Sequence, residues 1–474
     1  MKFKRWMLLL IGLALLATMV GCGTAEEVSY EDDPEAMDQL TIYYHEDWWY
    51  MREYKLKRNI DMYNQRWGCQ RSVKMVLFKD AQSMYDRLLD DLMIGEGPDI
   101  IYLDRKAHQY INIAKIAKQN VFADMDILAE QDDTFNLDDY NAMAMETGLV
   151  DGKRVMMPVS YRVLPMLAIK ECFEGNGFSI PDRLTMDIYL DYMESFHQRH
   201  EEPALLGIDP VYLLSEYIVM GKTIEDEDRA ELKRVLGIIQ EEHQRGEIYP
   251  HYADKREWQK HYRSQYEDAM NRYVSTRVAY GELMLDKHLL FYDMYEEELN
   301  FFHGLYHNYN IFRQSGGELV LMQQPHRDDD IKAYTDDFLL INVNSKQKNK
   351  AFQFVEYMMS VNTSRDIVTH INLPISKEGY GCHKEALLEG YSKDFTSPKK
   401  NVVAMDEEVQ LPQEIKDQTI AYVEGVDSCQ FIGEFQYIYY NVINEHIQDY
   451  YNDHITCDEL IDAINNKLGI YYSE

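Results

Sequence analysis

The clearest pattern of hydrophobic and polar positions lies between Val73 and Asp104. It begins with a short run rich in β-forming residues at 73–78 and changes at Ala81 to a helical period. Glycine and proline at 95–98 end that helix, and the apolar run at 100–103 is typical of a strand buried on both faces. The residues of the apolar helix face are Tyr85, Leu88, Leu89, Leu92 and Met93.

A strand, a crossover helix and a second buried strand predict a parallel β-α-β unit. Ligands of open parallel sheets bind beyond the carboxyl ends of the strands. In this unit those ends carry Lys79, Asp80, Asp104 and Arg105. Asp104 and Arg105 suit charge-assisted hydrogen bonds to a ligand, although Asp104 is equally suited to cap a helix.

The first residues indicate export. Three basic residues precede an apolar run at 6–20, which is shorter than the roughly 18 to 20 residues that a membrane span needs. The run ends in small residues and Cys22, which resembles the lipobox of bacterial lipoproteins, with Met19 in place of the usual leucine. We therefore expect a signal peptide at 1–21, lipidation of Cys22 and a protein anchored on the outer face of the cell membrane. The alternative is a plain secretory signal with a chance cysteine.

Charge and cysteine content limit the partners and metal sites that the chain could have. Residues 22–38 are rich in Asp and Glu and predict a flexible acidic tether. The whole chain has a net charge of −34, which disfavours nucleic acid as a partner. Five cysteines follow Cys22 at irregular spacing, which matches no zinc pattern and leaves both buried thiols and a disulfide open.

Short motifs follow one another in order along the chain. A leading strand at 40–44 precedes I-x-x-Y-N at 60–64, G-x-GPDII-x-x-D at 95–104 and L-L-I-N-V-N-S at 339–345. Together with a D-G-K-R-V segment before Pro158 and an L-P-I-S turn ending at Ser376, these motifs are similar to those of the family 1 extracellular solute-binding proteins of ABC importers.

The resemblance implies a two-lobed α/β fold of the type II periplasmic-binding-protein-like class, in which each lobe is a mixed sheet flanked by helices. We expect lobe one to contain 39–158 and 322–344, and lobe two 159–321 and 345–474, with three hinge crossovers between them. Two segments depart from the family pattern. Residues 166–170 lack its tyrosine and asparagine, and the turn at 181–186 has methionine in place of tryptophan.

Binding a sugar requires planar polar groups and flat aromatic faces, and the chain has 37 tyrosines. The candidates lie near predicted strand ends that face the other lobe. For Trp48 and Trp49 the alternative role is to cover the sheet edge, and for the four second-lobe residues it is a place in the core. The candidate ligand-binding residues are Tyr44, Trp48, Trp49, Lys79, Asp104, Arg105, Tyr161, Arg162, Tyr280 and Glu282.

No arrangement of nucleophile and base that would indicate catalysis is present in the sequence. The resemblance implies a monomeric importer receptor that is not an enzyme, takes no cofactor or metal, binds a small solute such as a sugar or oligosaccharide, and delivers it to permease subunits. An alternative is a surface lipoprotein that binds a solute or peptide for sensing or adhesion without transport. A cell-surface hydrolase is a third hypothesis, which turnover of an oligosaccharide would support.

Overall fold

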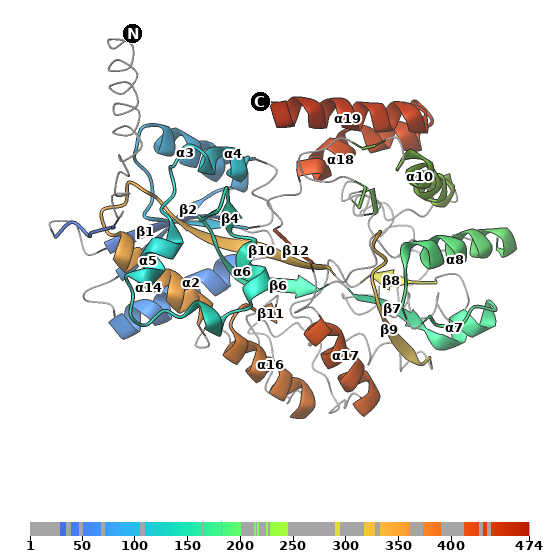
Figure 1. Ribbon diagram of the computed structural model, residues 1–474, viewed down its shortest axis with the longest axis horizontal. Helices are drawn as coiled ribbons and strands as arrows, with labels where there is room; N and C mark the ends of the chain where they lie inside the picture. The colour runs from blue at the N-terminus through green and yellow to red at the C-terminus, as the bar shows by residue number, and fades with distance from the viewer. Residues whose placement is uncertain are drawn as a thin grey trace, which may run out of the picture.

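The structure, a computed structural model, is shown in Figure 1. It describes residues 29–34, 39–46, 51–67, 72–104, 110–163, 165–181, 183–200, 213–214, 216–217, 224–225, 228–244, 290–293, 317–327, 332–360, 373–389, 412–425, 430–433 and 438–473.

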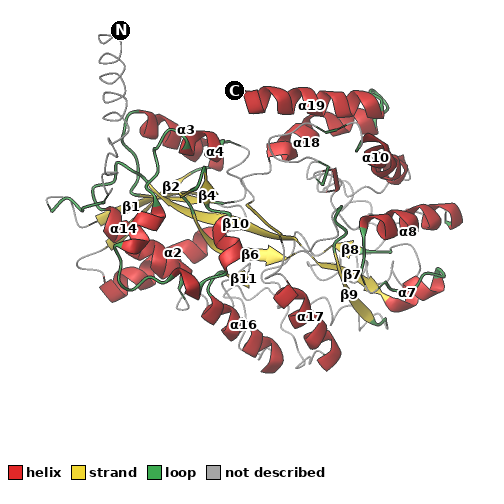
Figure 2. Ribbon diagram, viewed as in Figure 1, coloured by secondary structure: helices red, strands yellow, loops and turns green. Residues whose placement is uncertain are grey.

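The described strands form a large sheet, a small sheet and a hairpin. The large sheet has the order β11-β6-β10-β3-β1-β2, with β12 also paired to β10, and the small sheet has the order β8-β7-β9. Figure 2 shows the two sheets side by side, each with its own helices. The strands are β1 (Gln39–His45), β2 (Ser72–Phe78), β3 (Ile100–Leu103), β4 (Leu149–Val150), β5 (Lys153–Arg154), β6 (Met157–Val163), β7 (Pro165–Ile169), β8 (Tyr292–Asp293), β9 (Leu319–Gln323), β10 (Lys332–Ile341), β11 (Leu373–Pro374) and β12 (Gln430–Gly433).

The predicted β-α-β unit is confirmed. Strands β2 and β3 both run parallel to β1, which lies between them, and α3 (Ala81–Met93) connects them. Asp80 caps that helix by accepting a hydrogen bond from the Ser83 amide at 2.7 Å. Gly95 has φ +75°, the left-handed conformation that a helix stop requires. The local sequence therefore determines both the helix and its limits.

Helices cover both faces of the large sheet, because its strands alternate between two cores. Ile100 and Tyr102 of β3 face the core that contains α2 (Met51–Trp67), α5 (Met125–Glu130) and α14 (Lys348–Met359). Ile101 and Leu103 face the other core, beneath α3 and α4 (Ile113–Ala117). The run is therefore apolar at every position, as predicted for a strand buried on both faces.

Two of the motifs interlock at the amino end of this sheet. Asp99 of the G-x-GPD motif accepts hydrogen bonds from the Thr41 amide at 2.8 Å and from the Ser345 hydroxyl at 2.7 Å. Asn342 donates to the carbonyl oxygen of Glu96 at 2.9 Å. These polar residues therefore join β1, β3 and the end of β10, and their role is structural.

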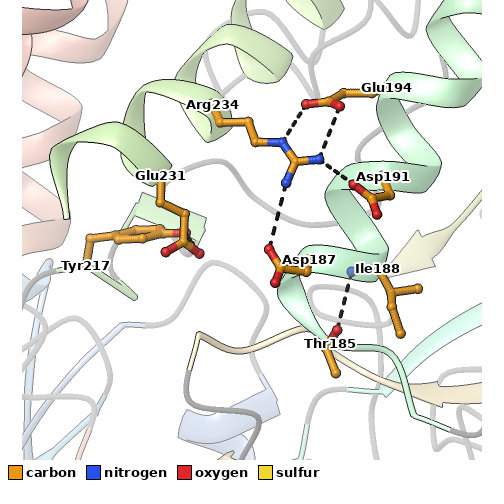
Figure 3. A network of polar contacts seen from close by, with 8 residues as sticks. All are labelled: Thr185, Asp187, Ile188, Asp191, Glu194, Tyr217, Glu231 and Arg234. Carbon is orange, nitrogen blue, oxygen red and sulfur yellow. Dashed lines mark hydrogen bonds and ion pairs between the residues drawn. The ribbon is translucent and has the colours of Figure 1, made fainter. Parts of the chain in front are cut away.

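The helices around the small sheet are held partly by charge. Arg234 of α10 lies between three carboxylates of α8, namely Asp187, Asp191 and Glu194 (Figure 3). In the described residues α10 also packs against the C-terminal pair α18 and α19. The remaining described helices are α6 (Ala142–Glu146), α7 (Lys170–Gly175), α8 (Met186–Arg199), α10 (Arg229–Gln244), α16 (Lys377–Glu389), α17 (Gln413–Gly425), α18 (Ile438–Tyr451), α19 (Cys457–Ser473) and the 3-10 helix Leu137–Asp139.

The predicted division into lobes needs correction. The first crossover was expected at 158, yet all of β6 belongs to the large sheet and the chain enters the small sheet only at Pro165. The return was expected at 322, but β9 pairs with β7 along its whole length. Strands β11 and β12, expected in lobe two, pair with β6 and β10 of the large sheet. Helix α14, also expected in lobe two, packs on β6, α2 and α5.

The predicted acidic tether also needs correction at residues 29–34. Tyr30, Asp32 and Asp33 bond to the body of the protein at α5 and at the start of α14. In the described residues no helix is long and apolar enough to cross a membrane. Cys382 and Cys457 are free thiols and Cys172 is buried, whereas Cys69 and Cys429 lie outside the described residues.

Candidate ligand-binding site

The carboxyl ends of β1 and β3 meet at a buried pair of side chains. The Nε2 atom of His45, which ends β1, lies 2.9 Å from Oδ2 of Asp104, which follows β3. Both side chains are only 1% exposed. Tyr85 reaches the same carboxylate from α3 and donates its hydroxyl to Oδ1 at 3.3 Å. The β-α-β unit thus places three polar groups at the sheet edge where ligands bind in folds of this class.

The contacts of His45 determine the charge of this pair. Its Nδ1 atom lies 3.0 Å from the carbonyl oxygen of Glu46, which only accepts, so Nδ1 carries a proton. Between Nε2 and the Asp104 carboxyl group there is one further proton, because one of the two atoms must donate. Whether the proton is on the ring or on the acid, the pair as a whole is neutral. The pair therefore adds no net charge to this wall of the site.

An aromatic surface lies beside the pair. Tyr110 stacks on Tyr85 with ring centroids 5.6 Å apart and an interplanar angle of 21°. Tyr85 is fully buried, whereas Tyr110 is 37% exposed. Burial, followed by the charges of Asp104 and Asp80, raises the pKa of Tyr110, so its hydroxyl stays protonated at neutral pH. Tyr110 thus offers a flat ring and a hydroxyl donor near the carboxyl end of β3.

Strands β6 and β10 extend the polar surface past the end of β3. Leu103 pairs with Phe338, and the next residue of β10 towards its amino end is Asp337, which pairs with Ser160. Arg162 pairs with Tyr334 and lies over its ring at 5.5 Å. A register shift between β6 and β10 at Asp337 accompanies this change from apolar to polar side chains. Ser160, Arg162 and Asp337 are all buried, as is Asp104.

The predicted site residues do not all lie at one surface of the protein. Asp104 and Arg162 belong to this polar surface, and Lys79 is exposed at the end of β2. Tyr44 and Tyr161 were predicted to contact ligand, but both lie in the hydrophobic core. Their strands bury every second side chain against the α2 and α14 side of the sheet, and both residues lie in that phase. The remaining predicted residues lie outside the described part of the chain, namely Cys22, Trp48, Trp49, Arg105, Tyr280 and Glu282.

Sequence reasoning missed His45, Tyr85, Tyr110 and Asp337. Tyr85 was assigned only to the apolar face of its helix, because a tyrosine at a core position gives no sign that its hydroxyl has a partner. His45 and Asp104 are 59 positions apart, so only the pairing of β1 with β3 brings them together. An aromatic residue six positions after Asp104 was the one local signal for Tyr110.

A second polar cluster lies where the chain returns from the small sheet to the large one. The Glu216 carboxylate lies 3.1 Å from Nδ1 of His326 and accepts a hydrogen bond from Lys332, the first residue of β10. Burial raises the pKa of Glu216, but the hydrogen bond and charge of His326 and the charge of Lys332 outweigh it and lower the pKa to about 2. We call Glu216, His326 and Lys332 the crossover cluster.

Within the described residues, no group of three or more His, Cys, Asp or Glu side chains is placed to hold a metal ion.

Comparison with known proteins supports the fold. No family model and no curated protein matches the sequence. Among solved structures, an extracellular solute-binding protein of family 1 from Alicyclobacillus acidocaldarius is 11% identical with a TM-score of 0.56, over 93% of this chain and 100% of that one. An ABC substrate-binding protein from Listeria monocytogenes in complex with cycloalternan is 12% identical with a TM-score of 0.53, over 92% and 99% of the two chains. A maltose-bound protein from T. maritima is 14% identical with a TM-score of 0.52, over 91% and 99%.

Each match covers more than nine-tenths of both chains, so the similarity extends across both sheets. The predicted fold class is therefore confirmed: the chain has the α/β, two-lobed fold of type II periplasmic-binding proteins, with mixed sheets flanked by helices.

Proposed function

We propose that this chain is the extracellular, lipid-anchored solute-binding component of an ABC importer, and that it binds a sugar or oligosaccharide between its two lobes. The observation that carries the proposal is the whole-length match to solute-binding proteins, one of which holds cycloalternan and another maltose. The receptor binds and releases its solute without making or breaking a covalent bond.

The chemistry at the end of β3 supports a sugar ligand. A polyol needs planar hydrogen-bonding groups for its hydroxyls and flat apolar surfaces for its C–H faces. Tyr110 supplies an accessible ring beside the neutral pair of His45 and Asp104. Arg162 supplies a buried guanidinium group further along β6, where it pairs with Tyr334, four residues along β10 from the partner of Leu103. We propose these four residues as the wall contributed by the large sheet.

Further contacts are proposed from predicted residues outside the described ranges. Trp48, Trp49 and Arg105 follow β1 and β3 directly in the sequence and complete the same wall, while Tyr280 and Glu282 are proposed for the opposite wall.

The mechanism follows from two lobes joined by crossovers. An open form binds solute on one lobe, and the closed form is favoured only by contacts that the solute makes with both lobes. A receptor with micromolar affinity requires about 8 kcal/mol of net binding free energy. A few buried hydrogen bonds and one stacked ring supply free energy of this order after the costs of closure. The closed form is then delivered to the permease subunits.

A thermal-shift screen over sugars, oligosaccharides, amino acids, peptides and polyamines tests this proposal. A ligand at 100 times its dissociation constant adds about 2.7 kcal/mol to the free energy of unfolding, which is a clear shift. We expect the response among sugars or oligosaccharides. A response confined to peptides or polyamines overturns the carbohydrate assignment, and turnover of an oligosaccharide by the purified protein overturns the receptor function.

A further inference from the structure

Within the acidic segment before β1, residues 30–33 are attached to the large-sheet lobe. Asp32 accepts hydrogen bonds from the backbone amides of Asn349 at 2.9 Å and Lys350 at 3.3 Å. These amides lie in the first turn of α14, where helix N–H groups lack partners within the helix. The residue at the N-cap position, Gln347, makes no capping hydrogen bond with its side chain. Asp32 therefore caps α14 from more than 300 positions away in the sequence.

Tyr30 provides a second set of contacts. Its backbone N–H donates to Oε1 of Gln131 at 3.2 Å, and its carbonyl oxygen accepts from Nε2 of Gln131 at 3.0 Å. The same carbonyl oxygen accepts from the side chain of Asn349 at 2.9 Å. Its hydroxyl oxygen accepts from the Asp124 amide at 3.2 Å, and the Lys348 ammonium group lies 5.5 Å from the centre of its ring. Tyr30 thus bridges α5 and α14.

Asp33 extends the attachment by one residue. Its backbone N–H donates to the carbonyl oxygen of Lys346 at 2.7 Å, and its carboxylate lies 3.7 Å from the Lys346 ammonium group. By contrast, the neighbouring Glu31 is exposed. Tyr30, Asp32 and Asp33 therefore attach this segment to two helix ends, while the side chain of Glu31 is exposed to solvent.

We propose that residues 30–33 form a latch that fixes the N-terminal segment to α5 and α14, and so holds this edge of the large-sheet lobe close to the membrane. The membrane part rests on the proposed lipid anchor at Cys22. From Cys22 to the first latched residue, Tyr30, there are eight residue steps, which reach at most about 28 Å. Without the latch the free length would extend to Gln39, seventeen steps, or about 60 Å.

Because the tether is short, the lobe that contains α5 and α14 stays beside the bilayer during delivery of the solute. The small-sheet lobe remains on the other side of the crossovers. The latch makes no contact with His45, Asp104 or Tyr110 among the described residues, so its loss should leave solute affinity unchanged.

Two neighbouring acids provide a matched test. Asp32→Ala removes the cap, whereas Glu31→Ala removes the same charge from an exposed side chain. Hydrogen exchange on the chain without its signal peptide should show the Asn349 and Lys350 amides exchanging about tenfold faster in Asp32→Ala, the effect of losing one helix cap, and unchanged in Glu31→Ala. Equal exchange in the two variants and the wild type overturns the latch.

The membrane part is tested on the lipidated protein in vesicles with dansyl phospholipid as energy acceptor. Trp67, whose ring lies 5.4 Å from that of Tyr357 in α14, is one native donor on this side of the lobe. We expect tryptophan-to-dansyl transfer to fall in Asp32→Ala and to be retained in Glu31→Ala. Equal transfer in both overturns the membrane orientation. Wild-type protein that does not partition with vesicles overturns the proposed anchor and the orientation with it, while the exchange experiment decides the latch independently.

Discussion

Replacing Glu216 with Gln should destabilise the protein through the crossover cluster. Glu216 and Lys332 each have side chains only 8% exposed, and His326 is 5% exposed. The substitution keeps the shape of the side chain but removes a negative charge that faces two basic groups. Lys332 begins β10, so the lost contact is at the point where the chain enters the large sheet.

The magnitude follows from the pKa of Glu216. Binding to His326 and Lys332 holds the pKa at about 2 in the folded protein, against an ordinary value of 4.5. This difference corresponds to about 3 kcal/mol of stabilisation at neutral pH. Breaking one partner of a buried ion pair in other proteins costs about 3–5 kcal/mol, which agrees. Because the folded-state pKa is depressed, the stabilisation is complete above pH 4.5 and is lost as the pH falls towards 2.

The assay is urea denaturation of wild type and Glu216→Gln between pH 7 and pH 3. We expect a difference in unfolding free energy of about 3 kcal/mol at pH 7 that narrows below pH 4.5. Glu225→Gln is the control, because Glu225 is exposed in the same part of the chain. Glu216→Gln combined with Lys332→Met removes both charges and should recover part of the loss. Equal stability of Glu216→Gln and wild type at pH 7, or a difference that stays constant down to pH 3, would refute the reasoning.

Three further predictions concern the site, the helices and a turn. Tyr110→Ala should weaken binding of the ligand found in the screen by about tenfold in calorimetry, whereas Tyr110→Phe keeps the ring and most of the affinity; equal loss in both would contradict a stacking role. Arg234→Ala should lower the free energy of unfolding by about 1 kcal/mol, because its three carboxylate contacts are partly exposed, and 1 M salt should reduce the difference. Gly97→Ala should destabilise the protein by about 2 kcal/mol, since φ is +115° and a Cβ atom would lie 3.3 Å from two side chains. Gly95→Ala should cost only about 1 kcal/mol, because a Cβ atom there has ordinary contacts. Equal losses of thermal stability in the two variants would contradict this ranking.

Local elements were predictable because their signals are short in sequence. The Asp80 cap, the left-handed Gly95 and the apolar strand at 100–103 each depend on neighbouring residues, and the structure contains all three. The capping box of Thr456 and Glu459 is an equally local signal, in which the Thr456 amide donates to Oε2 of Glu459 at 2.7 Å.

The candidate site was only partly predictable. Polar residues were expected at the end of β3, because strand direction alone puts carboxyl ends at one edge, and their role in ligand binding stays a prediction. Tyr44 and Tyr161 were assigned to the wrong face. Tyr161 lies on a strand that is buried at every position, so the sequence there does not distinguish the core face from the site face. Tyr44 lies on a strand whose alternate side chains face the core, and Tyr44 is one of those buried side chains.

The sequence by itself determined where helices and strands begin and end, and which fold class the ordered motifs resemble. Only the tertiary structure decided which sheet each strand joins, that His45 pairs with Asp104, that Glu216 is held between His326 and Lys332, and that Asp32 caps α14. The physical reason is that periodicity and local capping act over a few residues, whereas these contacts join residues 59 to 318 positions apart. These contacts stabilise the protein only after folding has brought their residues together.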